Sequence, residues 1–115
     1  MSEKQDWPAL LTHIGDALPR FQRVNPSTFK AFVNVLEVNH NLTEIDAKTR
    51  ELIAVAVAAA IHCDGCIAYH VHEAKKAGAT IKEVGAALAT AMTIGMGSKF
   101  IQTTYAMDAY EQLGT

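Results

Sequence analysis

The stretch LIAVAVAAAIHCDGCIAYHVHEAKKAG, residues 52–78, predicts the architecture of this chain. It opens with LIAVAVAAAI, an apolar run of ten residues. A helix that crosses a bilayer needs about 20 such residues, so this run is typical of a buried core helix. Its remainder holds both cysteines of the chain. Lys75, Lys76 and Gly78 then mark the end of a further helix, because cations and glycine favour a helix C-terminus.

Helical spacing of apolar residues continues on both sides of this stretch, and no segment alternates as a strand does. We therefore predict an all-α fold, a single-domain bundle of five to six helices over residues 1–115. The expected helices cover about residues 7–18, 26–38, 81–94 and 98–113, with a third helix that starts at Thr43 or Asp46 and a fourth that starts at or within the C-x-x-C motif and runs to about Ala77. Pro19 is expected to follow the end of the first helix, and the pattern Thr80-Ile81-Lys82-Glu83 predicts a capping box before the fifth.

Apolar residues of the third expected helix define its predicted core face: Leu52, Ile53, Val55, Ala56 and Ala59. A stripe on the second helix comprises Phe29, Phe32, Val33 and Leu36. The sixth helix carries Phe100, Ile101, Tyr105, Met107 and Tyr110. A chain this short has more apolar side chains than one small core needs, so we expect homo-oligomers, with part of the sixth helix facing another subunit. The alternative is that these residues face their own core.

The charge balance excludes some classes of partner. The formal net charge is −2 and the isoelectric point about 6.2, which favours neither nucleic acid nor an anionic membrane as a partner. The first residues, MSEKQDWPALL, lack the basic-then-apolar order of a signal peptide, so a reducing cytoplasm is expected. In that compartment a C-x-x-C pair is more often catalytic or metal-binding than structural.

The segment HCDGCIAYHVH, residues 62–72, concentrates nucleophiles, bases and metal ligands. Cys63 and Cys66 are three residues apart, and His70 follows four residues later, so a helix places all three on one face. An imidazole one turn from a thiol can take its proton, and a helix N-terminus favours the thiolate. We therefore predict Cys66 as the attacking thiol and Cys63 as the partner that closes a disulfide.

Glu51 stands beside Leu52 and Ile53 in an otherwise apolar helix. A carboxylate at the edge of a core destabilises the fold unless it is paired. It either pairs with Arg50 or Lys48 at the surface, or points inward as a base or as the group that orients a histidine. The spacing alone does not decide between these two interpretations.

His62 and Tyr69 are accessory candidates beside the cysteine motif. His62 borders Cys63 and is a second base or a solvent-facing residue; Tyr69 packs over the site or in the core. A rival hypothesis is a zinc site in which His62, or a residue of another subunit, completes a ligand set of Cys63, Cys66 and His70. A further alternative is a redox sensor or thiol-disulfide reductase that turns over no peroxide. The residues by themselves imply no cofactor.

In one register, the chain has Glu51, eleven residues, Cys63-Asp-Gly-Cys66, three residues and His70. Around them stand RELIAVAV at residues 50–57, HxxEAxxAGAT at residues 70–80 and IxEV at residues 81–84. This pattern resembles the AhpD-like alkylhydroperoxidases of the carboxymuconolactone decarboxylase superfamily. The resemblance covers about residues 30–100, the expected core of the domain.

The resemblance implies an all-helical domain that assembles into trimers or hexamers. It also implies a thiol-dependent peroxidase that reduces alkyl hydroperoxides through a redox-active disulfide. Cys66 would attack the peroxide and Cys63 would resolve it. Glu51 and His70 would relay the proton that leaves Cys66. The implied reductant is an external dithiol, dihydrolipoyl or thioredoxin-like.

One position departs from the family pattern. Well-studied peroxidases of this family carry a histidine just before the second cysteine, where this chain has Gly65. The departure leaves the proton relay incomplete by that pattern and puts the rate and the substrate in question. Decarboxylases of the superfamily do not use a C-x-x-C pair, which makes lactone decarboxylation the weaker alternative.

Overall fold

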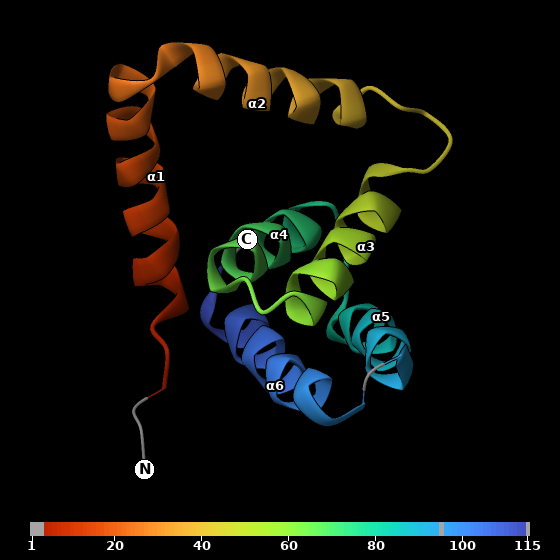
Figure 1. Ribbon diagram of the computed structural model, residues 1–115. Helices are drawn as coiled ribbons and strands as arrows, with labels where there is room; N and C mark the ends of the chain where they lie inside the picture. Colours follow the sequence, from red (N-terminus) through yellow and green to blue (C-terminus); the bar gives the residue numbers. More distant parts are fainter. Residues whose placement is uncertain (1–3, 95, 115) are drawn as a thin grey trace.

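The computed structural model describes residues 4–94 and 96–114, and these residues contain six helices. They are α1 (Trp7–Val24), α2 (Pro26–His40), α3 (Ala47–Ala60), α4 (Asp64–Lys76), α5 (Ile81–Ile94) and α6 (Met96–Gln112). The described residues contain no strand, so the predicted all-α fold is confirmed (Figure 1). No helix among them has the length and apolarity to cross a membrane.

A body of four helices, α3 to α6, holds the core, while α1 and α2 form an arm beside and above it (Figure 1). The buried residues are mostly small: Val55, Ala58, Ala59, Ile67, Ala68, Val71, Ala74, Val84, Leu88, Ala106, Ala109 and Leu113. Alanines allow close approach of the helix backbones, which offsets the small apolar area that each buries. The arm is tied to this body by Trp7, which is fully buried and donates its backbone N–H to Gln112 at 2.8 Å.

Local signals of the sequence explain where several helices begin and end. The predicted capping box is confirmed: Thr80 N–H donates to Glu83 Oε1 at 2.9 Å, and Glu83 N–H donates to Thr80 Oγ1 at 3.1 Å. Asp46 caps α3 by accepting the N–H of Thr49 at 2.7 Å. Gly78, with a φ of 91°, follows the end of α4 as expected, because glycine adopts this left-handed backbone without strain.

Pro19 does not end the first helix, contrary to the expectation from sequence. It lies inside α1, which continues to Val24. A proline ring removes the hydrogen bond to the carbonyl four residues earlier, here that of Gly15. Gly15 is exposed, so water can satisfy that carbonyl. Asn25 ends the helix instead: its N–H donates to Phe21 O at 2.8 Å, and its side chain caps α2 by accepting the N–H of Thr28.

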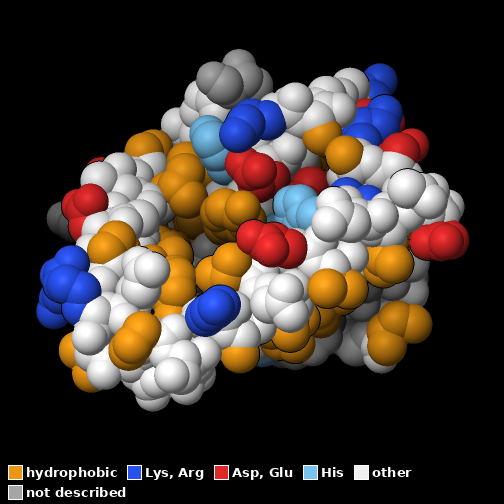
Figure 2. All heavy atoms as spheres, turned by 90° about the horizontal axis from the view of Figure 1, so that it is seen from above, with side chains coloured by type: hydrophobic (Ala, Val, Ile, Leu, Met, Phe, Trp, Pro, Cys, Tyr) orange, Lys and Arg blue, Asp and Glu red, His pale blue; other side chains and the backbone are white. Residues whose placement is uncertain are grey.

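The predicted apolar faces are only partly buried. In α3, Val55 and Ala59 are core residues, but Ile53 is 51% exposed, so its assignment to the core was wrong. In α2 no residue is buried, and Phe32 and Leu36 of the predicted stripe are exposed. The cause is the position of α2, which has its main contacts with α1 rather than with the body. Figure 2, seen from the α2 side, shows hydrophobic side chains gathered in a hollow on this face.

The apolar residues of α6 divide between the two predicted environments. Met107 and Tyr110 pack against the core cluster of their own chain. Phe100 and Ile101 are more than half exposed, and Tyr105 is 38% exposed. Met107 and Tyr110 therefore face the core of their own chain, as the alternative expected. Phe100, Ile101 and Tyr105 leave an apolar surface on the monomer.

Candidate functional site

A tight turn between α3 and α4 positions the cysteine motif. Cys63 N–H donates to Ala58 O at 3.1 Å and His62 N–H donates to Ala59 O at 3.3 Å, the bond pattern of a Schellman motif. His62 takes the left-handed position of this motif, with a φ of 59°, and is exposed. Only residues 61–63 separate the two helices, so Cys63 and Cys66 stand at the start of α4 directly after α3 ends.

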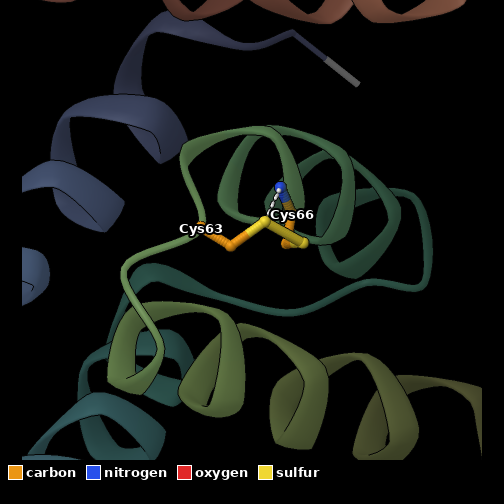
Figure 3. Close-up of a disulfide and its surroundings, with 2 residues drawn as sticks. All are labelled: Cys63 and Cys66. Atoms are coloured by element: carbon orange, nitrogen blue, oxygen red, sulfur yellow. Dashed lines mark hydrogen bonds between the residues drawn. A yellow bond between two sulfur atoms is a disulfide. The ribbon is translucent and has the colours of Figure 1, made fainter.

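Cys63 and Cys66 form a disulfide at the first turn of α4 (Figure 3). Their Cα atoms are 5.2 Å apart, and both residues are partly buried. Cys63 is the N-cap of α4, and its Sγ accepts the backbone N–H of Cys66 at 3.2 Å. The predicted proximity of the two sulfurs therefore follows from the helix start itself, because the N-cap side chain faces the N–H groups of the first turn.

Glu51 points inward and meets His70, which resolves the two interpretations left open by its spacing. Its Oε1 lies 2.8 Å from Nδ1 of His70, and its side chain is only 7% exposed. The surface alternative was wrong, because both candidate cations have other partners. Lys48 pairs with Glu83 at 2.7 Å, and Arg50 donates to the carbonyl of Leu42 at 2.8 Å.

This pair lies one helical turn from the disulfide. His70 follows Cys66 by four residues on α4, which places their Cβ atoms about 5–6 Å apart on one face. Glu51 contributes from α3 and fixes the orientation of the imidazole through Nδ1. Nε2 of His70 is then the nitrogen available for proton exchange.

The accessory candidates occupy different environments. Tyr69 packs edge-on against the His70 ring, with ring centroids 5.0 Å apart, and its side chain remains 42% exposed. Partial burial, with the negative charges of Glu73 and Glu51, raises the pKa of the Tyr69 phenol, which stays protonated at neutral pH. His62 lies in the turn that ends α3, where it adopts the left-handed backbone conformation, and it is not part of the Glu51–His70 pair.

A pocket of about 300 Å³ opens beside the Glu51–His70 pair, between α2 and α3. Its wall is largely apolar and includes Leu36, Ile45, Ile53 and Val57, with Glu51 and His70 at its polar side. Sequence reasoning missed the contribution of α2, because nothing local indicates that Leu36 lies opposite Val57. Ile53, misassigned to the core, is one of these wall residues.

A second feature missed from sequence is the contact between α1 and the cysteine motif. A Cβ atom added at Gly65 would lie 3.0 Å from Cδ1 of Ile14. Where well-studied peroxidases of the family have a histidine, this chain has Gly65, and Ile14 of α1 occupies the adjoining space. A larger residue at position 65 requires this side chain to move.

The zinc hypothesis finds no support in the arrangement of the site. Within residues 4–94 and 96–114, no group of three or more His, Cys, Asp or Glu residues is placed to hold a metal ion. Both cysteine sulfurs are engaged with each other in the disulfide.

Comparisons with known proteins place this geometry in context. Residues 26–109 match the model of the Carboxymuconolactone decarboxylase family. The fold is similar to the apo crystal structure of a carboxymuconolactone decarboxylase family protein from Legionella pneumophila. That similarity has a TM-score of 0.89 and 28% identity, over 95% of this chain and 97% of the other. Both matches confirm the resemblance seen in the sequence.

Two relatives extend the comparison across bacteria. An uncharacterized protein of Cupriavidus necator is 27% identical over 94% of this chain and 96% of its own length. "Uncharacterized protein 4 in cox locus" of Paracoccus denitrificans is 30% identical over 84% of this chain and 87% of its own length. Neither name assigns an activity.

Proposed function

Because the chain belongs to the carboxymuconolactone decarboxylase family, we propose that it is a thiol-dependent peroxidase of the alkylhydroperoxidase type. One observation carries the proposal: a Cys63–Cys66 disulfide stands at the start of α4, and a partly buried Glu51–His70 hydrogen bond lies one turn away. A thiol pair that forms a disulfide supplies two electrons, and the acid–base pair supplies proton transfer. Reduction of a hydroperoxide requires both.

The oxidative half of the cycle begins at Cys66. Its thiolate attacks the terminal oxygen of the hydroperoxide, the O–O bond breaks, and the alkoxide that leaves is protonated to the alcohol. Cys66 becomes a sulfenic acid. The sulfur of Cys63 then attacks the sulfur of Cys66, water leaves, and the disulfide forms. The peroxide gains two electrons and the thiol pair loses two.

His70 and Glu51 carry out the proton transfers of these steps. Nε2 of His70 takes the proton of the Cys66 thiol, and the Nδ1–Glu51 hydrogen bond stabilises the imidazolium that results. The same proton is then available to the departing alkoxide. Glu51 and His70 stand at the polar side of the pocket between α2 and α3. The hydroperoxide is proposed to enter through this pocket, with its alkyl group against the apolar wall.

A complete cycle also needs a partner that returns two electrons. We assign this role to an external dithiol, dihydrolipoyl or thioredoxin-like, in a reducing cytoplasm. The thiols and the acid–base pair together need no cofactor. Phe32, Phe100 and Ile101 are more than half exposed in the monomer, which supports a trimer or hexamer in which a second copy covers them.

The test is oxidation of the thiols by peroxide. Reduced, metal-free protein is treated with tert-butyl hydroperoxide, quenched with an alkylating agent and measured by intact mass. We expect two alkylation sites to disappear as peroxide is consumed, and Cys66→Ser to abolish the consumption. Full alkylation after peroxide would refute the peroxidase. Disulfide formation without catalytic turnover in the presence of a dithiol would instead indicate a redox sensor or thiol-disulfide reductase.

A further inference from the structure

Three hydrogen bonds hold Cys63 at the start of α4. Its N–H donates to Ala58 O at 3.1 Å, and its carbonyl accepts the N–H of Ile67 at 2.9 Å. Its Sγ accepts the N–H of Cys66 at 3.2 Å. The sulfur of Cys63 therefore lies among the free N–H groups of the first turn, where the partial positive charge of the helix favours an anion.

Cys66 is held in a different environment. It is the third residue of α4 and packs against the buried core cluster. Its neighbour one turn on, His70, has Nδ1 committed to Glu51. While the disulfide is intact there is no thiol proton for His70 to take, so with the Nδ1–H donated to the carboxylate, Nε2 is a proton acceptor and offers no N–H to an anion. The site is thus arranged to remove a proton from Cys66, whereas the helix start stabilises a thiolate at Cys63.

We infer that the two sulfurs are not equivalent when the disulfide is reduced: the incoming dithiol attacks Sγ of Cys66, and Cys63 leaves as the thiolate. In thiol–disulfide exchange, the sulfur whose thiolate is better stabilised leaves faster. The hydrogen bond from Cys66 N–H provides that stabilisation at Cys63 and depends only on the backbone. This inference rests on the proposed function for its biological setting, but not for its chemistry.

In the reductive half of the cycle, the donor dithiol transfers two electrons to the protein through a mixed disulfide. A donor thiolate forms a bond to Sγ of Cys66, the Cys63–Cys66 bond breaks, and its electron pair stays on Cys63. The product is a mixed disulfide between the donor and Cys66. The second thiolate of the donor then attacks the donor sulfur of this mixed disulfide, and Cys66 departs with its electron pair and takes up a proton. The donor is oxidised by two electrons and the protein is reduced by two.

The sequence makes the first step directly observable. Asp64 lies between the cysteines, so a protease that cleaves before aspartate separates Cys63 from Cys66. Protein oxidised with diamide is mixed with glutathione, a monothiol, quenched at short times with N-ethylmaleimide, digested and analysed by mass spectrometry. Extrapolated to zero time, we expect glutathione on Cys66 and maleimide on Cys63, favoured about tenfold over the reverse. Glutathione mainly on Cys63, or an equal distribution, would overturn the inference.

A second measurement uses a matched pair of variants. Cys66→Ser keeps the N–H at position 66 that bonds to Cys63, while Cys63→Ser leaves Cys66 as the single thiol. Thiolate absorbance near 240 nm followed against pH should show that the thiol of Cys63 in Cys66→Ser ionises at a lower pH than the thiol of Cys66 in Cys63→Ser/His70→Gln, where no imidazole can take its proton. Ionisation of Cys66 at the lower pH would contradict the assignment. Because diamide replaces peroxide throughout, failure of this inference and failure of the peroxidase proposal are observed in separate experiments.

Discussion

Nδ1 of His70 and Oε1 of Glu51 are 2.8 Å apart, although the two residues are 19 positions apart in the chain. This hydrogen bond joins α4 to α3 at the edge of the core, where the Glu51 carboxyl group is largely withdrawn from solvent. A buried carboxylate without a partner would destabilise the fold, so the pairing serves stability as well as the proposed proton transfer.

Glu51→Gln tests the proton relay. The amide retains a polar partner for His70 but carries no charge to stabilise an imidazolium. We expect the rate of thiol oxidation by tert-butyl hydroperoxide to fall about a hundredfold, the lower end of the effect of a general base. Stopped-flow measurement of the reduced protein would give this rate. Glu83→Gln is the control, because it removes a surface carboxylate paired with Lys48; equal rates in both variants would exclude a relay at Glu51.

Val57→Ser tests the pocket beside the pair. If the alkyl group lies against its apolar wall, each buried methylene contributes about 0.8 kcal/mol, or about fourfold in the second-order rate constant. Wild-type protein should therefore prefer n-hexyl hydroperoxide to hydrogen peroxide, and Val57→Ser should reduce this ratio. Val38→Ser is matched in chemistry and exposure, since Val38 is 59% and Val57 52% exposed. A wild-type ratio near one would place the alkyl group elsewhere.

Gly65→His tests why the family's histidine is missing. A side chain at this position meets Ile14 of α1 within 3.0 Å, so the single variant should lose about 1–3 kcal/mol, as overpacked sites do. In the Ile14→Ala background, Gly65→His should therefore cost less free energy of unfolding than it does in the wild-type protein. Urea denaturation of the four proteins gives the coupling between the two positions. Strictly additive effects would mean that the two side chains do not compete for the same space.

His62 and Gly78 occupy the same left-handed position after α3 and α4, with φ values of 59° and 91°. A residue with a Cβ atom is disfavoured there by about 1–2 kcal/mol. His62→Gly should therefore leave stability unchanged or improve it. Gly78→Ala should lower stability by about 1 kcal/mol through backbone strain alone, because no atom lies within 4 Å of the added Cβ to clash with it. Thermal denaturation would compare them. A marked loss of stability in His62→Gly would reveal a side-chain contact that the backbone argument omits.

Phe32→Asp tests self-association. This side chain is 55% exposed on α2, which buries none of its residues in the monomer. If a second copy covers α2, a charge at this position should shift the protein toward monomer in sedimentation velocity. Asn34→Asp adds the same charge on the same helix and should leave the assembly intact. A wild-type protein that sediments as a monomer at micromolar concentration would refute the proposal.

Much of the fold was predictable because its signals are local. The capping box of Thr80 and Glu83, the glycine after α4 and the spacing of Cys63 and Cys66 all act within four residues, over which helix geometry decides what meets. The extension of α1 past Pro19 was not predictable in this way. It depends on whether water or protein surrounds the carbonyl that the proline leaves free.

By itself, therefore, the sequence determined the six helices, most of their ends, and a thiol pair at the start of α4 with an imidazole one turn away. Only the tertiary structure decided that Glu51 meets His70, that Ile53 faces a pocket, and that Ile14 adjoins Gly65. Each of these contacts joins two helices, and its existence depends on how those helices pack. Spacing along one helix specifies which residues share a face, but it does not specify which face of another helix lies opposite.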